Sequence, residues 1–333
     1  MLKRMRSILN PAAYHGAVLR PPFFEGWYFK LVDAGEGQRF AILPGVFMGR
    51  SAEESHAFVQ VLNGLTGQVD YHTYPIEQFQ SAADRFDIRI GENRFRTDAI
   101  HLAIDRPEGS VRGVLAFESP VGWPVSVLSP GIMGWYAWVP RMECYHGVLG
   151  FDHSIHGSLR VDGRTVDFSG GRGYIEKDWG MSFPQAWVWM QSNHFEQPGV
   201  CLTASVAIIP WLGNAFAGFI AGLWLEGALH TFATYACGRI SALQVDDHLV
   251  RWRLENQLHT LEIEATRAEG GLLHAPTPSG MGRRIAETLS AEIGVRLVER
   301  PSGRLVFEGM GRHAGLEAVG DLARLQRMAL KGK

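Results

Sequence analysis

Alternation of hydrophobic and polar residues dominates this chain and predicts β-strands. The clearest case joins 157–161 to 164–168 through an Asp-Gly dipeptide, which is typical of a two-residue hairpin turn. Similar alternation runs through 58–62 and 69–74, on either side of a glycine-containing turn. Short strands at regular spacing are typical of antiparallel sandwiches and barrels, so the pattern predicts an all-β protein.

Helical patterns are scarce. Residues 283–293 carry apolar side chains four positions apart, which fits a short helix or a strand. The tail 314–330 has apolar and charged residues at helical spacing and predicts an amphipathic terminal helix. The longest apolar run, 208–225, is interrupted by Pro210 and several glycines. We therefore interpret it as two buried strands around a turn rather than as a membrane span.

The length of the chain predicts two domains, because 333 residues exceed what one compact core usually holds. A glycine-rich stretch at 169–173 lies near the middle of the chain and offers a flexible crossing between them. We expect an N-terminal domain over 1–165 and a C-terminal domain over 166–333.

Charge and cysteine content exclude several classes of protein. A net charge of −2 without a basic stripe gives no general attraction to nucleic acid. Three cysteines without C-x-x-C spacing argue against a disulfide framework or a zinc site and fit a reducing compartment. No apolar run follows the basic N-terminus, so we expect no signal peptide and a cytoplasmic location. The 10 tryptophans suit either a protein that covers a large apolar ligand or a Trp-rich core.

One segment combines ionisable residues with aromatic ones. Alternation along a strand places Tyr174, Glu176 and Asp178 on one face, and Lys177 and Trp179 on the other. A carboxyl group removed from water favours its protonated form, so this segment can hold a general acid inside an aromatic cavity. The alternative is an ion-pair cluster between core tryptophans, and the spacing fits both.

Two further segments place polar residues among apolar ones. Trp187, Trp189 and Gln191 share one strand face, and Gln191 and Asn193 end an otherwise apolar strand, where they can hydrogen-bond the head group of a ligand. Near the N-terminus, Glu25 lies beside an aromatic run in what we interpret as the first strand.

A group of histidines and acids raises the question of a metal. It comprises Glu143, His146, Asp152, His153 and His156. His153 and His156 are three positions apart, which suits a helix better than the strand expected here. We interpret these histidines as hydrogen-bonded residues near a barrel rim and predict no metal site. The chain has no G-x-S-x-G motif, so a hydrolase triad has little support.

The stretches 174–180, 182–184 and 187–193 resemble the signature of the tocopherol cyclase family. Residues 24–30 are similar to that family's N-terminal motif, and 315–317 to its C-terminal end. The resemblance implies two lipocalin-like antiparallel β-barrels with a short C-terminal helix. It also implies proton-initiated closure of a prenylated hydroquinone to a chromanol, without a nicotinamide, flavin or metal cofactor.

More distantly, the chain resembles carotenoid hydratases, in which a Tyr-x-Asp pair is implicated in protonating an alkene. Tyr174-x-Glu176 looks like the matching pair, with Glu in place of Asp. Asp178 stands where plant cyclases often carry Asn, so the proton donor is either Glu176 or Asp178. Tyr174 would hydrogen-bond the acid, and Lys177 would stabilise the carboxylate left behind. The residues expected to contact the substrate are Glu25, Trp27, Tyr28, Lys177, Trp179, Trp187, Trp189, Gln191 and Asn193.

Two other functions stay open. A lipocalin-like protein can carry an isoprenoid without changing it, and a hydratase would let water capture the cation in place of the phenol. In each case the expected partner is a lipophilic small molecule, collected through transient contact with a membrane surface.

Overall fold

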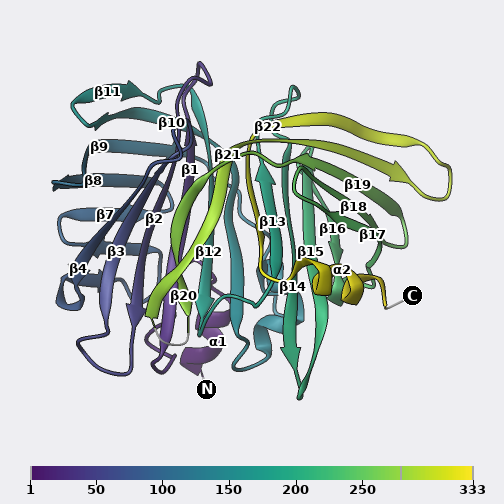
Figure 1. Cartoon of the computed structure of the whole chain (residues 1–333), viewed down its shortest axis with the longest axis horizontal. Helices are drawn as coiled ribbons and strands as arrows, with labels where there is room; N and C mark the ends of the chain where they lie inside the picture. The colour runs from purple at the N-terminus through teal and green to yellow at the C-terminus, as the bar shows by residue number, and fades with distance from the viewer. Residues whose placement is uncertain (1, 278–279, 332–333) are drawn as a thin grey trace. The chain divides into compact units, whose positions relative to one another are not determined.

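The computed structural model describes residues 2–277 and 280–331, and most of its elements are strands. Tertiary contacts divide the chain into two units, one of residues 1–183 with 272–284, the other of residues 184–271 with 285–333. Each unit is built on a large antiparallel sheet, and a short helix ends the chain (Figure 1). The predicted all-β fold class is confirmed.

The first sheet has 12 strands in the order β4-β3-β2-β1-β12-β10-β9-β8-β7-β6-β5, with β11 paired to β10. Its strands are β1 (Phe23–Val32), β2 (Arg39–Met48), β3 (His56–Asn63), β4 (Val69–Pro75), β5 (Phe79–Ser81), β6 (Asp87–Ile90), β7 (Asn93–Arg96), β8 (Ala99–Arg106), β9 (Gly109–Glu118), β10 (Cys144–Val161), β11 (Arg164–Asp167) and β12 (Gly171–Gly180).

The second sheet has 10 strands in the order β16-β15-β14-β13-β22-β21-β19-β18-β17, with β20 paired to β21. Its strands are β13 (Trp187–Ser192), β14 (Cys201–Trp211), β15 (Asn214–Leu225), β16 (Ala228–Ala233), β17 (Arg239–Val245), β18 (Leu249–Glu255), β19 (His259–Thr266), β20 (Gly271–Thr277), β21 (Gly280–Glu299) and β22 (Leu305–Val319). The helices are α1 (Leu2–Ile8), α2 (Leu322–Leu330) and three short 3-10 helices at Ile76–Gln78, Gly131–Trp138 and Thr234–Ala236.

The boundary expected between residues 165 and 166 lies inside the first unit. It falls within β11, which pairs with β10, and β12 then pairs with both β10 and β1. The glycine-rich stretch at 169–173 therefore connects two strands of one sheet. The chain first passes from the first unit to the second after Phe183.

Two hairpin predictions are confirmed. Asp162 and Gly163 join β10 to β11 with φ of 48° and 81°, the left-handed pair that a type I′ turn requires. The apolar run 208–225 forms parts of β14 and β15, and Leu212 and Gly213 turn between them with φ of 47° and 81°. In the described part of the chain, no helix is long and apolar enough to cross a membrane.

The undecided segment 283–293 belongs to strand β21. Ile285, Leu289 and Ile293 are all buried, because a spacing of four returns to the same face of a strand as well as of a helix. Spacing alone was therefore unable to distinguish the two structures.

The predicted terminal helix is shorter than expected. Residues 314–319 extend β22, so the prediction was wrong for them, and α2 begins only after Asp321. The Asp321 side chain accepts the backbone N–H of Arg324 at 2.8 Å and so caps the helix. Leu325 of α2 joins the core of the second unit.

Strand β1 shows how alternation builds the first unit. Trp27, Phe29 and Leu31 all belong to the buried core of that unit. Ile175 of β12 joins the same core. The odd-numbered side chains of β12 therefore face this core, and the even-numbered ones face away from it.

Candidate functional site

Strand β12 lies between β1 and β10, in the middle of the first sheet. Its core face carries Lys177, and its opposite face carries Tyr174, Glu176 and Asp178. Two consecutive positions of one strand thus place ionisable groups on opposite sides of the sheet. The predicted alternation is confirmed.

Glu176 is the more enclosed of the two candidate acids. Its side chain is 6% exposed, against 27% for Asp178. The buried Tyr174 donates its phenolic hydrogen to Glu176 Oε2 over 2.6 Å. Hydrogen bonds between a hydroxyl and a carboxyl group at this distance are short and strong, so this one fixes the position of the carboxyl.

His146 of β10 lies close to both acids. Its Nδ1 lies 2.9 Å from Asp178 Oδ1, and its Nε2 lies 3.5 Å from Glu176 Oε2. Because a carboxylate only accepts hydrogen bonds, the shorter contact places the proton of a neutral imidazole on Nδ1. Nε2 then faces Glu176 as a base. The sequence placed His146 among histidines expected to be hydrogen-bonded near a barrel rim, without naming its partners, because its approach to Asp178 depends on the register between β10 and β12.

The register of β1 brings two more side chains to this face. Tyr28 stands opposite Glu176, and Lys30 stands opposite Tyr174. Directly opposite residues of antiparallel strands project to the same side, and both side chains are buried. Tyr28 was predicted as a site residue, whereas the buried Lys30 was missed. Alternation along β1 places these two residues on one face, and the pairing with β12 places that face beside the acid.

The core face of β12 holds a buried ion pair. Lys177 Nζ lies 2.6 Å from Glu25 Oε1, and both side chains are fully buried. The ammonium also donates to the backbone carbonyls of Pro11 and Ala13, over 3.1 and 2.5 Å, and lies 2.8 Å from His15 Nδ1. The segment before β1 is thereby held against β12.

Aromatic rings complete the surroundings of this ion pair. Lys177 Nζ lies 4.9 Å from the ring centroid of Trp27 and 4.8 Å from that of Trp179, within range of cation–π attraction. His15 stacks on Trp179 with centroids 4.3 Å apart. Burial lowers the pKa of Lys177 to about 8, although Glu25 opposes this shift. Burial alone would raise the pKa of Glu25, but Lys177 and His15 together hold it below its usual value.

Four residues expected to bind substrate therefore pack against one another, and their contact with a substrate stays a prediction. Glu25, Trp27, Lys177 and Trp179 all lie on the core face, so their contacts explain the fold of this region. The expected stabilisation of the Glu176 carboxylate by Lys177 is not supported, because the ammonium points to the other side of the strand. The sequence pattern itself contained this information, since adjacent strand positions alternate.

The other predicted contacts belong to the second unit and lie on or just after β13. They are Trp187, Trp189, Gln191 and Asn193. Gln191 and Asn193 are fully buried, and Gln191 Nε2 lies 3.5 Å from Asn193 Oδ1. The expected polar end of the strand is present, and its role in binding a head group stays a prediction.

One group of side chains has the composition of a metal site. Ligand atoms of His146, Glu176 and Asp178 lie within 4.8 Å of one another. One nitrogen and two carboxylate oxygens suit several divalent cations. In the structure these same atoms take part in the hydrogen bonds and close contacts described above.

The remaining histidines of the cluster considered in the sequence have different surroundings. His156 is half exposed and lies 3.2 Å from Glu118, as expected for a histidine at a rim. His153 is buried against Phe117, and neither ring nitrogen has a hydrogen-bond partner among the described residues. Burial lowers the pKa of His153 to about 3, so this ring is neutral in the folded protein.

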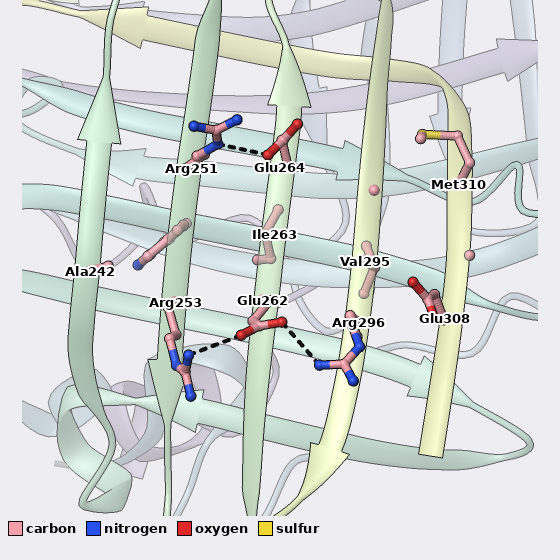
Figure 2. Close-up of a pocket in the computed structure, with 13 residues that line it drawn as sticks. Ala242, Arg251, Arg253, Glu262, Ile263, Glu264, Val295, Arg296, Glu308 and Met310 are labelled. Atoms are coloured by element: carbon pink, nitrogen blue, oxygen red, sulfur yellow. Dashed lines mark hydrogen bonds and ion pairs between the residues drawn. The ribbon is translucent and has the colours of Figure 1, made fainter. Parts of the chain in front are cut away.

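A hollow of about 660 Å³ lies on the sheet of the second unit (Figure 2). Five of its charged side chains pair across the strands: Arg251 with Glu264 at 2.7 Å, and Glu262 with Arg253 at 3.0 Å and with Arg296 at 3.3 Å. These side chains are partly exposed and paired, which is typical of a solvated sheet face. None of the predicted site residues lines this hollow.

Comparison with known proteins shows which family the chain belongs to. The model of the tocopherol cyclase-like family matches residues 115–320, more than half of the chain. The chain belongs to this family. The matched span includes the faces of β10 and β12 that carry His146, Glu176 and Asp178, and the resemblance predicted from the motifs is confirmed.

Two plant relatives support the same family. The chain is 25% identical to a protein named "Probable tocopherol cyclase, chloroplastic" from Oryza sativa subsp. japonica, over 95% of this chain and 80% of that protein. It is 26% identical to the tocopherol cyclase, chloroplastic, of Zea mays, over 95% of this chain and 78% of that protein.

Solved structures show the same fold at lower identity. Kievitone hydratase from Nectria haematococca aligns with a TM-score of 0.51 at 11% identity, over 89% of each chain. The protein CghA aligns with a TM-score of 0.55 at 12% identity, over 91% of this chain and 90% of that one. These likenesses show the fold alone.

Proposed function

We propose that this chain is an enzyme that cyclises a prenylated hydroquinone to a chromanol, with Glu176 as the proton donor. The observation that carries the proposal is the enclosed carboxyl group of Glu176, hydrogen-bonded by Tyr174 and close to His146. A carboxyl group enclosed in this way suits a general acid. The family and the plant tocopherol cyclases among the relatives support the choice of substrate.

The reaction balances without any other reactant. The carboxyl proton of Glu176 passes to the less substituted carbon of the alkene nearest the ring, and positive charge develops on the other alkene carbon. The phenolic oxygen attacks that carbon, forms the new C–O bond and releases its own proton. One proton enters and one leaves, so the product is an isomer of the substrate and no electrons are transferred.

His146 supplies a route for the proton that the phenol releases. The exposed fraction of the side chains rises from 6% at Glu176 through 14% at His146 to 27% at Asp178. A neutral His146 that donates from Nδ1 to Asp178 can accept a proton at Nε2 or pass one to Glu176. In the proposed cycle this chain of groups returns Glu176 to its acid form.

An alkene is a very poor base, so acidity alone does not account for the reaction. Burial keeps a carboxyl group protonated but also makes it a weaker acid. An oriented intramolecular nucleophile can lower a barrier by roughly 7–11 kcal/mol. We therefore assign much of the rate enhancement to the enclosed conformation of the prenyl chain, with attack by the phenol as protonation proceeds.

Hydration is the second candidate reaction. The Tyr174-x-Glu176 pair, which resembles that of the carotenoid hydratases, would protonate an alkene in the same way, and water would then capture the cation. The two reactions differ only in the nucleophile, so the product distinguishes them: a chromanol in one case and a tertiary alcohol in the other.

The first experiment incubates purified protein with a phytyl-hydroquinol, without added cofactor, and analyses the product. We expect chromanol from the wild type and at least a 100-fold lower rate from Glu176→Gln, since general acids contribute roughly 10²–10⁴-fold. Asp178→Asn is the matched variant. It removes a carboxylate from the same strand face, but Asp178 is more exposed than Glu176 and is not the proposed proton donor. We expect a smaller loss from Asp178→Asn.

Two outcomes would contradict this assignment. If Asp178→Asn abolished turnover while Glu176→Gln retained it, Asp178 would be the donor. If the folded wild type bound the compound and formed neither chromanol nor alcohol, the chain would be a carrier or act on a different substrate.

A further inference from the structure

Strand β13 of the second unit carries a buried face that its hydrophobic core does not use. Val188 and Met190 belong to the core of that unit. Trp187, Trp189 and Gln191 alternate with them and project from the opposite face, yet all three are buried. A polar amide thus lies among tryptophans on a face from which water is excluded.

The hydrogen bonds of Gln191 are incomplete. The side chain is fully buried, and its Oε1 has no hydrogen-bond partner among the described residues. Its Nε2 makes one long contact, 3.5 Å from Asn193 Oδ1, and donates to Cys201 Sγ over 3.5 Å, an ordinary length for a hydrogen bond to sulfur. A buried amide oxygen without a donor costs stability, so this atom is available to a donor that arrives with a ligand.

A carboxyl group lies near this amide on the same face. Glu317 of β22 stands opposite Trp189, and its Oε2 accepts the indole N–H of Trp187 at 2.6 Å. Gly315, two positions earlier on β22, stands opposite Gln191 and contributes no side chain there. Carboxylate and amide oxygens both accept hydrogen bonds, and indole rings flank them.

From these contacts we infer that Gln191 and Glu317 form a recognition site for the hydroxyl groups of a phenolic ligand. Gln191 Oε1 accepts one hydroxyl hydrogen, and Glu317 presents a second acceptor held in place by Trp187. The tryptophan rings pack more favourably against an aromatic ring that carries the hydroxyl groups than against a polar group. The choice of a hydroquinone rests on the proposed function, whereas the preference for hydroxyl donors rests on the contacts of Gln191 alone.

The test measures binding without turnover. The ligands are a hydroquinone with a saturated alkyl chain, kept reduced, and its dimethyl ether. Neither has an alkene to protonate, and only the first can donate hydrogen bonds. Isothermal titration calorimetry with the full-length wild type is expected to give about tenfold tighter binding of the hydroquinone, the usual magnitude for a hydrogen bond to a buried acceptor.

The variant Gln191→Met keeps the length of the side chain and removes the acceptor. We expect the preference for the hydroquinone to fall to about twofold or less, and Gln244→Met, which changes an exposed glutamine of β17, to retain the tenfold preference. If Gln191→Met does not fold, Glu317→Gln serves instead, with a reduced preference expected.

Two results would overturn the inference: equal affinity of the wild type for the two ligands, or an undiminished preference in Gln191→Met. Because the probes cannot cyclise, both results are independent of whether the wild type produces a chromanol. A failure of the proposed reaction is therefore distinguishable from a failure of this site.

Discussion

The two faces of β12 bury ionisable groups in different surroundings. On the core face, Lys177 contacts Glu25, two backbone carbonyls and His15, and every one of these contacts fixes the fold. On the opposite face, Glu176 begins a chain of groups that continues through His146 to the partly exposed Asp178. Burial of an ionisable group is common to both faces. What distinguishes the second is a series of neighbouring titratable groups whose exposure to solvent rises from Glu176 to Asp178.

This difference separates stability from activity. Changes on the core face should affect the free energy of unfolding, because they leave a buried charge without its partner. Changes on the opposite face should affect turnover more than stability. The variants below test this division, from the largest expected effect to the smallest.

Lys177→Met should have the largest effect on stability. It leaves the fully buried Glu25 without its ammonium partner, and breaking a buried pair in this way typically costs about 3–5 kcal/mol. Urea denaturation followed by tryptophan fluorescence would measure the loss.

The double variant Glu25→Gln/Lys177→Met is the control for this prediction. Neither side chain is then charged, so we expect part of the lost stability to return. A single variant as stable as the wild type would show that the ion pair does not hold this region together.

The sequence predicted the division between the two faces of β12 but not the partners on either face. Alternation alone separated Glu176 from Lys177, and the family motifs drew attention to both. The pairing of Lys177 with Glu25 depends on the register of β1 against β12, which no local pattern determines. His146 was missed as a partner of Glu176 for the same reason, since β10 approaches β12 only in the folded sheet.

More of the fold than of the site could be predicted from the sequence, because strands and turns depend on local patterns. The Asp162-Gly163 turn was predictable from two residues, since it needs only a left-handed backbone at both. The extent of β22 was not, because residues 314–319 have a spacing that also suits a helix and are held as a strand by β13 and β21. Long-range pairing decided both the site and this boundary.

His153 should make the core face sensitive to acid. Burial lowers its pKa to about 3, whereas the ordinary value of 6.5 applies in the unfolded chain. Between these values the unfolded chain binds a proton that the folded chain does not, so stability falls as the pH falls, by up to about 1.4 kcal/mol per pH unit. We expect the wild type to lose about 1.6 kcal/mol more than His153→Leu between pH 6.5 and pH 5, since the unfolded-state histidine is already half protonated at pH 6.5.

The comparison between the wild type and His153→Leu isolates this effect, because every other titratable group is common to the two proteins. Parallel profiles for the wild type and His153→Leu would mean that His153 binds its proton equally in the folded and the unfolded chain, so that burial does not lower its pKa.

Tyr174→Phe should have the smallest effect, and on turnover rather than folding. It removes the hydroxyl that donates to Glu176 Oε2 at 2.6 Å and keeps the buried ring. Without this hydrogen bond the carboxyl group is less well positioned and its conjugate base less stabilised, so we expect kcat for chromanol formation to fall about tenfold with KM nearly unchanged. Tyr145→Phe is the matched control, because its hydroxyl donates to the backbone carbonyl of Val139 at 2.6 Å, away from the acid. If both variants lowered kcat equally, the effect would reflect a general loss of packing in the sheet, and the Tyr174 hydroxyl would have no specific part in protonation.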